Sequence, residues 1–243
     1  MLEIQNVTKS YLRRKALDDV SMQIEAGKTC LLLGPNGSGK TTLMKIIAGL
    51  TRPTSGRVTL GGQPIGTATK AHVAYMPTEN FFYNYMTIRD IGKYYADFFE
   101  DFDADHFRGM LEDMELEEED RIRQLSSGMA AKLRLSLTLS RRAELMMFDE
   151  PLNGVDILTR TQTIDAILAG RREVRSMIIS THLVDELEDV VDYTVFLKRG
   201  RLAMAGDKHD ICAGRTLKEV YLEVYGHVSA DPEHPAEEAK RYA

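Results

Sequence analysis

The chain has 243 residues, of which 43% are hydrophobic and 28% are charged, and its formal net charge is −6. This ordinary globular balance excludes a chain that is disordered throughout, and the overall acidity argues against a nucleic-acid-binding protein. The length exceeds the usual domain size of about 100–150 residues, so we expect one large α/β domain or two smaller units.

The first segments alternate apolar and polar residues, at positions 2–4 and again at 20–24, as half-buried antiparallel strands do. Thr29–Leu33 is instead a continuous apolar run, which predicts a central buried strand fed by an edge sheet. The further elements expected in this half are a helix over Lys40–Ala48, a turn cluster over Thr51–Gly56, and strands over Val58–Leu60 and Val73–Met76.

Residues 81–142 differ in character and predict a helical insertion into the sheet domain. A capping-box pattern over Thr87–Asp90 marks one helix start. Residues 97–120 hold twelve acidic residues against one arginine, and the simplest interpretation is a solvated acidic helix face. The leucines of 133–139 alternate as in a strand, but the length of the segment and Ser126 as a start signal favour a helix.

The second half repeats strand and helix, which is the pattern of a mostly parallel α/β sheet. The expected strands are Leu145–Phe148, Met177–Ser180 and Tyr193–Leu197, and the expected helices are Leu158–Ala169 and Val184–Val190. The last 17 residues, with two prolines and several glutamates, are typical of a loosely held tail.

A phosphate-binding pattern lies between the buried strand and the first helix. Residues 34–41 read GPNGSGKT and fit G-x-x-x-x-G-K-[ST]. The glycines let several backbone N–H groups point inward, Lys40 supplies a positive charge for the β- and γ-phosphates, and the Thr41 hydroxyl can bind Mg²⁺. Because the flanking strand and helix are the required ones, a plain glycine-rich turn is the weaker interpretation.

Two further strands end in polar residues. Leu145–Glu150 is an apolar strand that ends in two carboxylates, so Asp149 is expected at the carboxyl edge of the sheet, beside the phosphate loop. Asp149 can hold Mg²⁺ through water, and Glu150 is placed to orient and deprotonate an attacking water. His182 follows the apolar run Met177–Thr181, emerges at the same edge, and is a candidate to contact the γ-phosphate.

A second anion-binding candidate lies at a predicted helix start. Ser126, Ser127 and Gly128 are small residues there, where N–H groups and a hydroxyl can bind an anion. By itself the pattern is an ordinary helix N-cap. Its position, between the phosphate loop and the paired carboxylates, gives it weight.

These motifs, in this order, resemble the nucleotide-binding subunits of ABC transporters over about residues 1–225. Tyr11 sits where that family keeps an aromatic residue against adenine. The matching motifs are GPNGSGKTT (Gly34, Pro35, Asn36, Gly37, Ser38, Gly39, Lys40, Thr41, Thr42) for Walker A, LSSGM (125–129) for the signature, LMMFDE (145–150) for Walker B, NGVD ending in Asp156 for the D-loop, and STH ending in His182 for the switch histidine.

The resemblance implies a P-loop NTPase (RecA-like) α/β core with an antiparallel β subdomain and an inserted α-helical subdomain at about 81–142. It implies one nucleotide-binding domain over 1–225 and a short tail over 226–243. The ligands would be ATP and Mg²⁺. It also implies a head-to-tail dimer with a second nucleotide-binding subunit, identical or related, in which each ATP lies between one Walker A and the partner chain's signature, with Asp156 at the interface.

Three motifs depart from the family pattern. Ser127 and Met129 replace the commonest signature residues, and we expect little effect because Ser126 and Gly128 are kept. Thr78 stands where the Q-loop usually has glutamine, so metal coordination and coupling at that loop are in question, with Glu79 as a candidate substitute. Ile157 replaces a proline that often follows the D-loop aspartate, which we expect to be a minor change.

The leading hypothesis is an exporter-type ATPase motor that works with a separate multispanning membrane subunit, on the inner, cytoplasmic face of the cell membrane. The sequence has no apolar run near the roughly 20 residues of a membrane span and no signal-peptide pattern at its start. Cys30 and Cys212 are too few for a disulfide framework, so a reducing setting is expected. The alternative is a soluble ABC ATPase that acts on a protein assembly or a ribosome.

The aromatic residues are unevenly spread, since 11 of the 18 lie between Tyr75 and Phe107. Adjacent aromatics at 81–85 cannot all face one core, so some are expected to stay exposed as interface anchors. In the family that this chain resembles, this region receives the membrane subunit. We therefore expect docking near residues 78–102.

Overall fold

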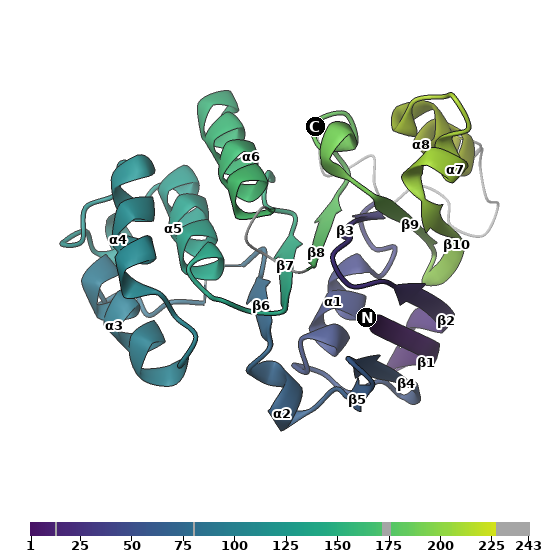
Figure 1. Ribbon diagram of the computed structural model, residues 1–243, viewed down its shortest axis with the longest axis horizontal. Coiled ribbons are helices and arrows are strands. Elements are labelled where there is room, and N and C mark those ends of the chain that lie inside the picture. Colours follow the sequence, from purple (N-terminus) through teal and green to yellow (C-terminus); the bar gives the residue numbers. More distant parts are fainter. Residues whose placement is uncertain (13, 80, 172–175, 227–243) are drawn as a thin grey trace.

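The computed structural model describes residues 1–12, 14–79, 81–171 and 176–226, and within them the chain forms two sheets (Figure 1). The smaller sheet is antiparallel, with strand order β2-β1-β4-β5. Its strands are β1 (Leu2–Tyr11), β2 (Arg14–Ile24), β4 (Ser55–Leu60) and β5 (Gln63–Pro64). The alternation at the start of the chain thus does reflect an antiparallel sheet with one buried face.

The larger sheet has the strand order β10-β9-β3-β8-β7-β6, and its strands run parallel except for the edge strand β10. The three central strands are buried along their whole length, as continuous apolar runs predict. The carboxyl ends of these parallel strands therefore open at one edge. The strands are β3 (Thr29–Leu33), β6 (Val73–Met76), β7 (Leu145–Asp149), β8 (Met177–Thr181), β9 (Tyr193–Lys198) and β10 (Arg201–Asp207).

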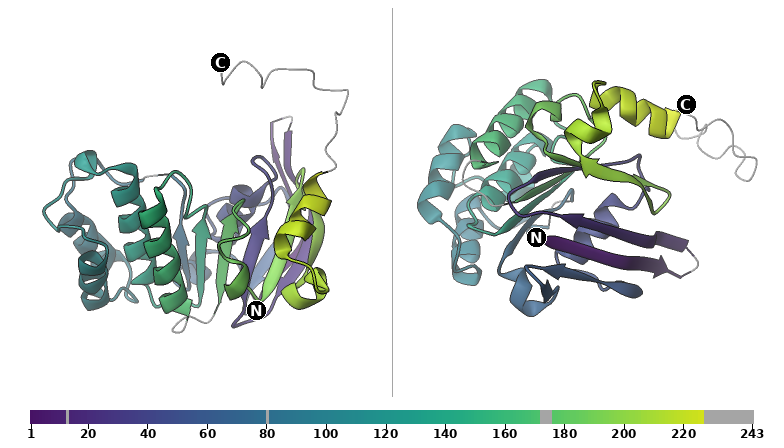
Figure 2. Two further views of the ribbon diagram at one scale, coloured as in Figure 1. Left: turned by 90° about the horizontal axis from the view of Figure 1, so that it is seen from above. Right: turned by 45° about the vertical axis from the view of Figure 1, so that its right-hand side comes forward.

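The helices divide between two cores. Helix α1 lies between the sheets and shares a core with strands of both, whereas α3, α4 and α5 lie together at one end of the molecule, opposite α8 (Figure 2). The helices are α1 (Lys40–Ile47), α2 (Thr67–Lys70), α3 (Ile88–Phe98), α4 (Ala104–Asp113), α5 (Ser127–Leu139), α6 (Ile157–Arg171), α7 (Lys208–Cys212) and α8 (Leu217–Gly226), with 3₁₀ turns at Ile122–Gln124 and Glu188–Val190.

Two helix starts follow the predicted side-chain caps. Thr87 Oγ1 accepts the Asp90 N–H at 3.1 Å, and Asp90 Oδ2 accepts the Thr87 N–H at 2.9 Å, so the capping box of α3 is complete. Ser126 Oγ accepts the Met129 N–H at 3.2 Å and begins α5. The leucines of 133–139 are helical and face the core, so the helix prediction for this stretch is confirmed.

One predicted helix is wrong. Val184–Val190 does not form an α-helix and contains only the 3₁₀ turn at its end. Glu188 is held by distant residues instead, since its carbonyl accepts the Lys208 Nζ–H at 2.6 Å and its carboxylate accepts the Leu217 N–H at 2.9 Å. These tertiary hydrogen bonds hold the segment in a conformation that local helical spacing does not predict.

Three other features bear on the sequence expectations. No helix in the described ranges is both long and apolar enough to cross a membrane. Cys30 and Cys212 are both free and buried, and burial raises the pKa of each thiol. The expected tail, 226–243, lies outside the described residues except for Gly226.

Arg141 ties the helical end of the molecule to the large sheet. Its guanidinium donates to Asp101 Oδ1 at 2.6 Å and to the Ala71 carbonyl at 3.0 Å, and lies 3.8 Å from the ring centroid of Phe99. Phe99 and Asp101 follow α3, whereas Ala71 leads into β6. The side chain is almost fully buried, so these contacts lie largely away from water.

We predict that Arg141→Ala lowers the free energy of unfolding by about 2–3 kcal/mol, because it removes hydrogen bonds of a buried charge and leaves their acceptors unpaired. Urea denaturation measures this loss. The neighbouring Arg142→Ala is the control, since Arg142 is exposed and its pair with Asp103 spans 2.7 Å at the surface. Arg142→Ala should lower the free energy of unfolding by less than about 1 kcal/mol. Equal losses in the two variants would contradict the stabilising role of the Arg141 contacts.

Candidate functional site

The phosphate-loop residues form a turn between β3 and the first residue of α1, where the sequence predicts it. Gly37 and Gly39 have φ values of +80° and +109°, which glycine adopts without strain. A Cβ added at Gly39 would lie 2.7 Å from the Ala16 carbonyl oxygen, so β2 leaves no room for a side chain there. The glycines therefore let the loop lie close against the small sheet.

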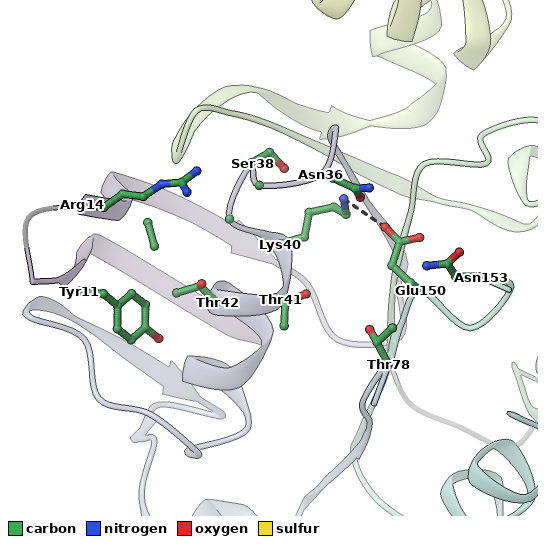
Figure 3. A pocket seen from close by; sticks show the side chains of 13 residues that line it. Tyr11, Arg14, Asn36, Ser38, Lys40, Thr41, Thr42, Thr78, Glu150 and Asn153 are labelled. Carbon is green, nitrogen blue, oxygen red and sulfur yellow. Dashed lines mark ion pairs between the residues drawn. The ribbon is translucent and has the colours of Figure 1, made fainter. Parts of the chain in front are cut away.

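The loop forms the floor of a cavity of about 400 Å³ (Figure 3). Tyr11 and Arg14 lie on one side of it, and Thr78, Glu150 and Asn153 lie on the other. The full lining is Tyr11, Arg14, Ala16, Asn36, Gly37, Ser38, Gly39, Lys40, Thr41, Thr42, Thr78, Glu150 and Asn153.

Lys40 and Glu150 form a buried ion pair within the lining of this cavity. Lys40 Nζ lies 3.1 Å from Glu150 Oε1 and donates to the Gly34 carbonyl at 2.6 Å. His182 Nδ1 lies 2.9 Å from Glu150 Oε2, and a carboxylate in this position can accept a hydrogen bond from an Nδ1–H. One carboxylate thus connects the phosphate-loop lysine with the histidine that follows β8.

The backbone of Glu150 is held in an uncommon conformation. Its φ is +50°, which is rare for a residue with a side chain. Its N–H is shared between the carbonyl and the hydroxyl of Ser180, each at 3.0 Å. The neighbouring strand therefore maintains the strained turn that aims the carboxylate into the cavity.

Asp149 lies one layer behind the cavity wall and is fully buried. Ser180 Oγ donates to its Oδ1 at 2.6 Å and the Tyr75 hydroxyl donates to its Oδ2 at 3.1 Å. Burial, with the charge of Asp149 beside it, raises the pKa of Tyr75, so the phenol stays a donor. The Thr41 hydroxyl lines the cavity, and a hydroxyl oxygen suits the preference of Mg²⁺ for oxygen ligands.

The two residues of the Q-loop-like segment, Thr78 and Glu79, line different cavities. Thr78 lines the cavity and its Oγ1 donates to the Asp149 carbonyl at 3.1 Å. Glu79 instead lines a second cavity of about 490 Å³, together with Tyr75 and Phe81. The short side chain of Thr78 is therefore anchored to the strand that carries Asp149.

The signature-like and D-loop-like residues form a second group, away from the cavity lining. Ser126 and Ser127 are exposed and Gly128 is buried at the start of α5. Asp156 accepts the Thr159 N–H at 3.0 Å and its hydroxyl at 2.8 Å, and these bonds hold the pKa of Asp156 below its usual value. The two segments pack together, since a Cβ at Gly128 would lie 3.3 Å from Thr159 Oγ1.

Two polar residues of the cavity, Asn153 and Arg14, were not predicted from the sequence. Asn153 begins the NGVD motif, directly before Gly154. Its place in this motif could have marked it as a candidate site residue. Arg14 lies three residues after Tyr11 in a basic run, and pairing between β1 and β2 brings the two residues opposite each other. The strand pairing shows that Arg14 lies beside Tyr11 at the cavity. The sequence spacing of the two residues predicts only a turn between them.

Comparison with known proteins places the chain among nucleotide-binding subunits. The sequence pattern of a family described as ABC transporter matches residues 17–153, more than half of the chain. An uncharacterized ABC transporter ATP-binding protein of Synechocystis sp. is 31% identical. The match covers 86% of this chain and 61% of that protein's length. The lantibiotic transport ATP-binding protein SrtF of Streptococcus pyogenes is 30% identical, over 84% of this chain and 90% of its own.

Solved structures agree on the fold. A structure described as an ATP-binding subunit of an ABC transporter has a TM-score of 0.82 and 26% identity, and covers 92% of this chain and 99% of its own. A dimeric ATP-binding cassette with ADP and phosphate bound has a TM-score of 0.76 at 19% identity, over 85% of this chain and 98% of its own. The expected P-loop NTPase core, with its antiparallel sheet and added helices, is confirmed.

Proposed function

Because the chain belongs to the ABC transporter family as an ATP-binding, ATP-hydrolysing subunit, we propose that it drives transport through a separate membrane-spanning subunit. Residues 1–225 would be its nucleotide-binding domain, placed as a peripheral protein on the cytoplasmic face of the cell membrane. The observation that carries the proposal is Glu150, which lies 3.1 Å from Lys40 and 2.9 Å from His182. The name of the lantibiotic relative, a transport ATP-binding protein, supports a role in transport.

In the proposed mechanism the loop and Lys40 bind the phosphates, while Tyr11 stacks on the base. Phosphate oxygens would replace Glu150 as the partner of Lys40, which frees the carboxylate to orient and deprotonate water. His182 would contact the γ-phosphate. Thr41, with Asp149 behind it through water, would hold Mg²⁺, which neutralises charge on the β- and γ-phosphate oxygens when bound.

We predict that Glu150→Gln keeps ATP binding and slows turnover by roughly 10²- to 10⁴-fold, because the amide fills the same space but cannot accept a proton. Phosphate release measures turnover, and calorimetric titration measures binding. Lys40→Ala is the comparison variant and should weaken binding itself. Full turnover in Glu150→Gln would remove Glu150 from the mechanism.

We also propose that ATP is shared between two subunits arranged head to tail, with either a second copy or a related chain. The support is the separation of the described site residues into two groups, one around Lys40 and one at the exposed start of α5. Ile157 and Leu158, directly after Asp156, are 81% and 67% exposed and are suited to burial in such an interface. Ser126, Ser127 and Gly128 would then bind the partner's γ-phosphate.

Mixing two inactive variants tests the shared site, because one site of a mixed dimer collects both defects and the other has none. We pair Lys40→Ala with Ser127→Glu, since the exposed Ser127 accepts a longer side chain, whereas any side chain at Gly128 meets Thr159. Partial recovery of ATPase activity on mixing is expected, relative to each variant alone. If the mixture stays inactive although mass spectrometry shows mixed dimers, no intact site forms in the mixed dimer. That result would contradict the head-to-tail arrangement.

The membrane subunit is proposed to dock around the second cavity, near residues 78–102. Phe81, Tyr83 and Tyr85 are 51%, 66% and 73% exposed, which is unusual for aromatic residues outside an interface. Phe82 instead packs against the helical core. Thr78 connects this loop to the strand of Asp149, so docking and the phosphate cavity share one segment.

We predict that replacing Phe81, Tyr83 and Tyr85 by serine leaves the basal ATPase activity near normal and prevents copurification of a multispanning protein from detergent-solubilised membranes. The matched control replaces Leu12 and Leu222, two exposed apolar residues outside this loop, by serine. Retained copurification in the triple variant would overturn the docking site. A soluble assembly or ribosome recovered with the unaltered chain would instead support the alternative function.

A further inference from the structure

Arg14 is a positive charge placed on the rim of the nucleotide cavity by strand register. Tyr11 ends β1 and Arg14 begins β2, and the two residues are direct partners in the antiparallel pairing. Both line the cavity, on the side opposite Glu150 (Figure 3). The hairpin thus presents an aromatic ring and a guanidinium together.

The guanidinium is directed toward the phosphate loop. A Cβ built on Gly37 would lie 3.5 Å from Arg14 Nη2, so the charge lies over the loop and not out along the hairpin. Glycine at this point keeps the space between the guanidinium and the loop free of side chains. Any ligand that rests on the loop beside Gly37 would come within reach of Arg14.

Arg14 also has no partner among the described residues, in contrast to the cations around it. Lys15 pairs with Asp18 at 2.9 Å, and Lys40 pairs with Glu150 at 3.1 Å. Glu150 is the sole acidic residue among those that line the cavity, and it lies at the opposite end. The Tyr11 end of the cavity therefore carries an uncompensated positive charge, suited to an anion.

We propose that Arg14 binds the phosphate nearest the base of a bound nucleotide, the α-phosphate, and so contributes to the affinity for ATP and ADP alike. This inference rests on the proposed nucleotide-binding function. Its position follows from the order of groups across the cavity, which runs from Tyr11 and Arg14 to Lys40 and Glu150. A nucleotide whose base stacks on Tyr11 and whose terminal phosphate reaches Lys40 brings the α-phosphate to the Arg14 side.

Calorimetric titration of the full chain with ATP and with ADP, in EDTA so that hydrolysis does not proceed, tests the proposal. Arg14→Gln should weaken the binding of both nucleotides by the same factor, about 10- to 100-fold, as expected for loss of a charge-assisted hydrogen bond. Arg14→Lys should recover part of the affinity through its charge. The affinity of the unaltered chain should also fall more steeply with added KCl than that of Arg14→Gln.

Lys15→Gln is the matched control, because it removes the same charge one residue away from a side chain that already pairs with Asp18. It should change neither affinity by more than about twofold. Equal losses in Lys15→Gln and Arg14→Gln, unchanged binding in Arg14→Gln, or a loss confined to ATP would each overturn the α-phosphate contact. If the unaltered chain binds neither nucleotide, the proposed function fails as well.

Discussion

The buried pair of Lys40 and Glu150 joins segments that lie more than a hundred residues apart in the chain. Each charge is removed from bulk water, so each depends on the other and on its remaining polar contacts, the Gly34 carbonyl and His182. Such a pair is stable only while no stronger anion is present. In the proposed mechanism, a triphosphate would offer Lys40 more charge than one carboxylate does, so nucleotide binding would release Glu150 from Lys40.

Polar residues beside this pair hold the two adjacent acids, Asp149 and Glu150, in different ways. Ser180 contacts both Asp149 and the Glu150 backbone, so the two adjacent acids are held by the same neighbouring strand. Asp149 is buried and accepts hydrogen bonds from Ser180 and Tyr75, while the Glu150 carboxylate contacts Lys40 and His182 among the described residues. In the proposed mechanism, the Glu150 side chain is therefore the one that exchanges partners.

Much of this site could be predicted because parallel strands bring their ends together. Lys40, Glu150 and His182 each follow a buried apolar run, and that pattern alone places them at one edge. Arg14 and the Tyr75 hydroxyl could not be placed, because their contacts depend on register across strands, which the sequence does not display. The failed helix at 184–190 has a related cause, since Lys208 binds the backbone carbonyl of Glu188 and the Leu217 N–H binds its carboxylate.

The burial of both thiols has a practical consequence for following the motions of this chain. Cys30 and Cys212 are the two cysteines of the sequence, and a thiol that stays protonated and enclosed reacts slowly with alkylating reagents. A new cysteine at an exposed position such as Tyr83 would therefore take up a spectroscopic label selectively, without removal of the natural pair. A second new cysteine at the other end of the molecule would then allow the distance between the two ends to be measured.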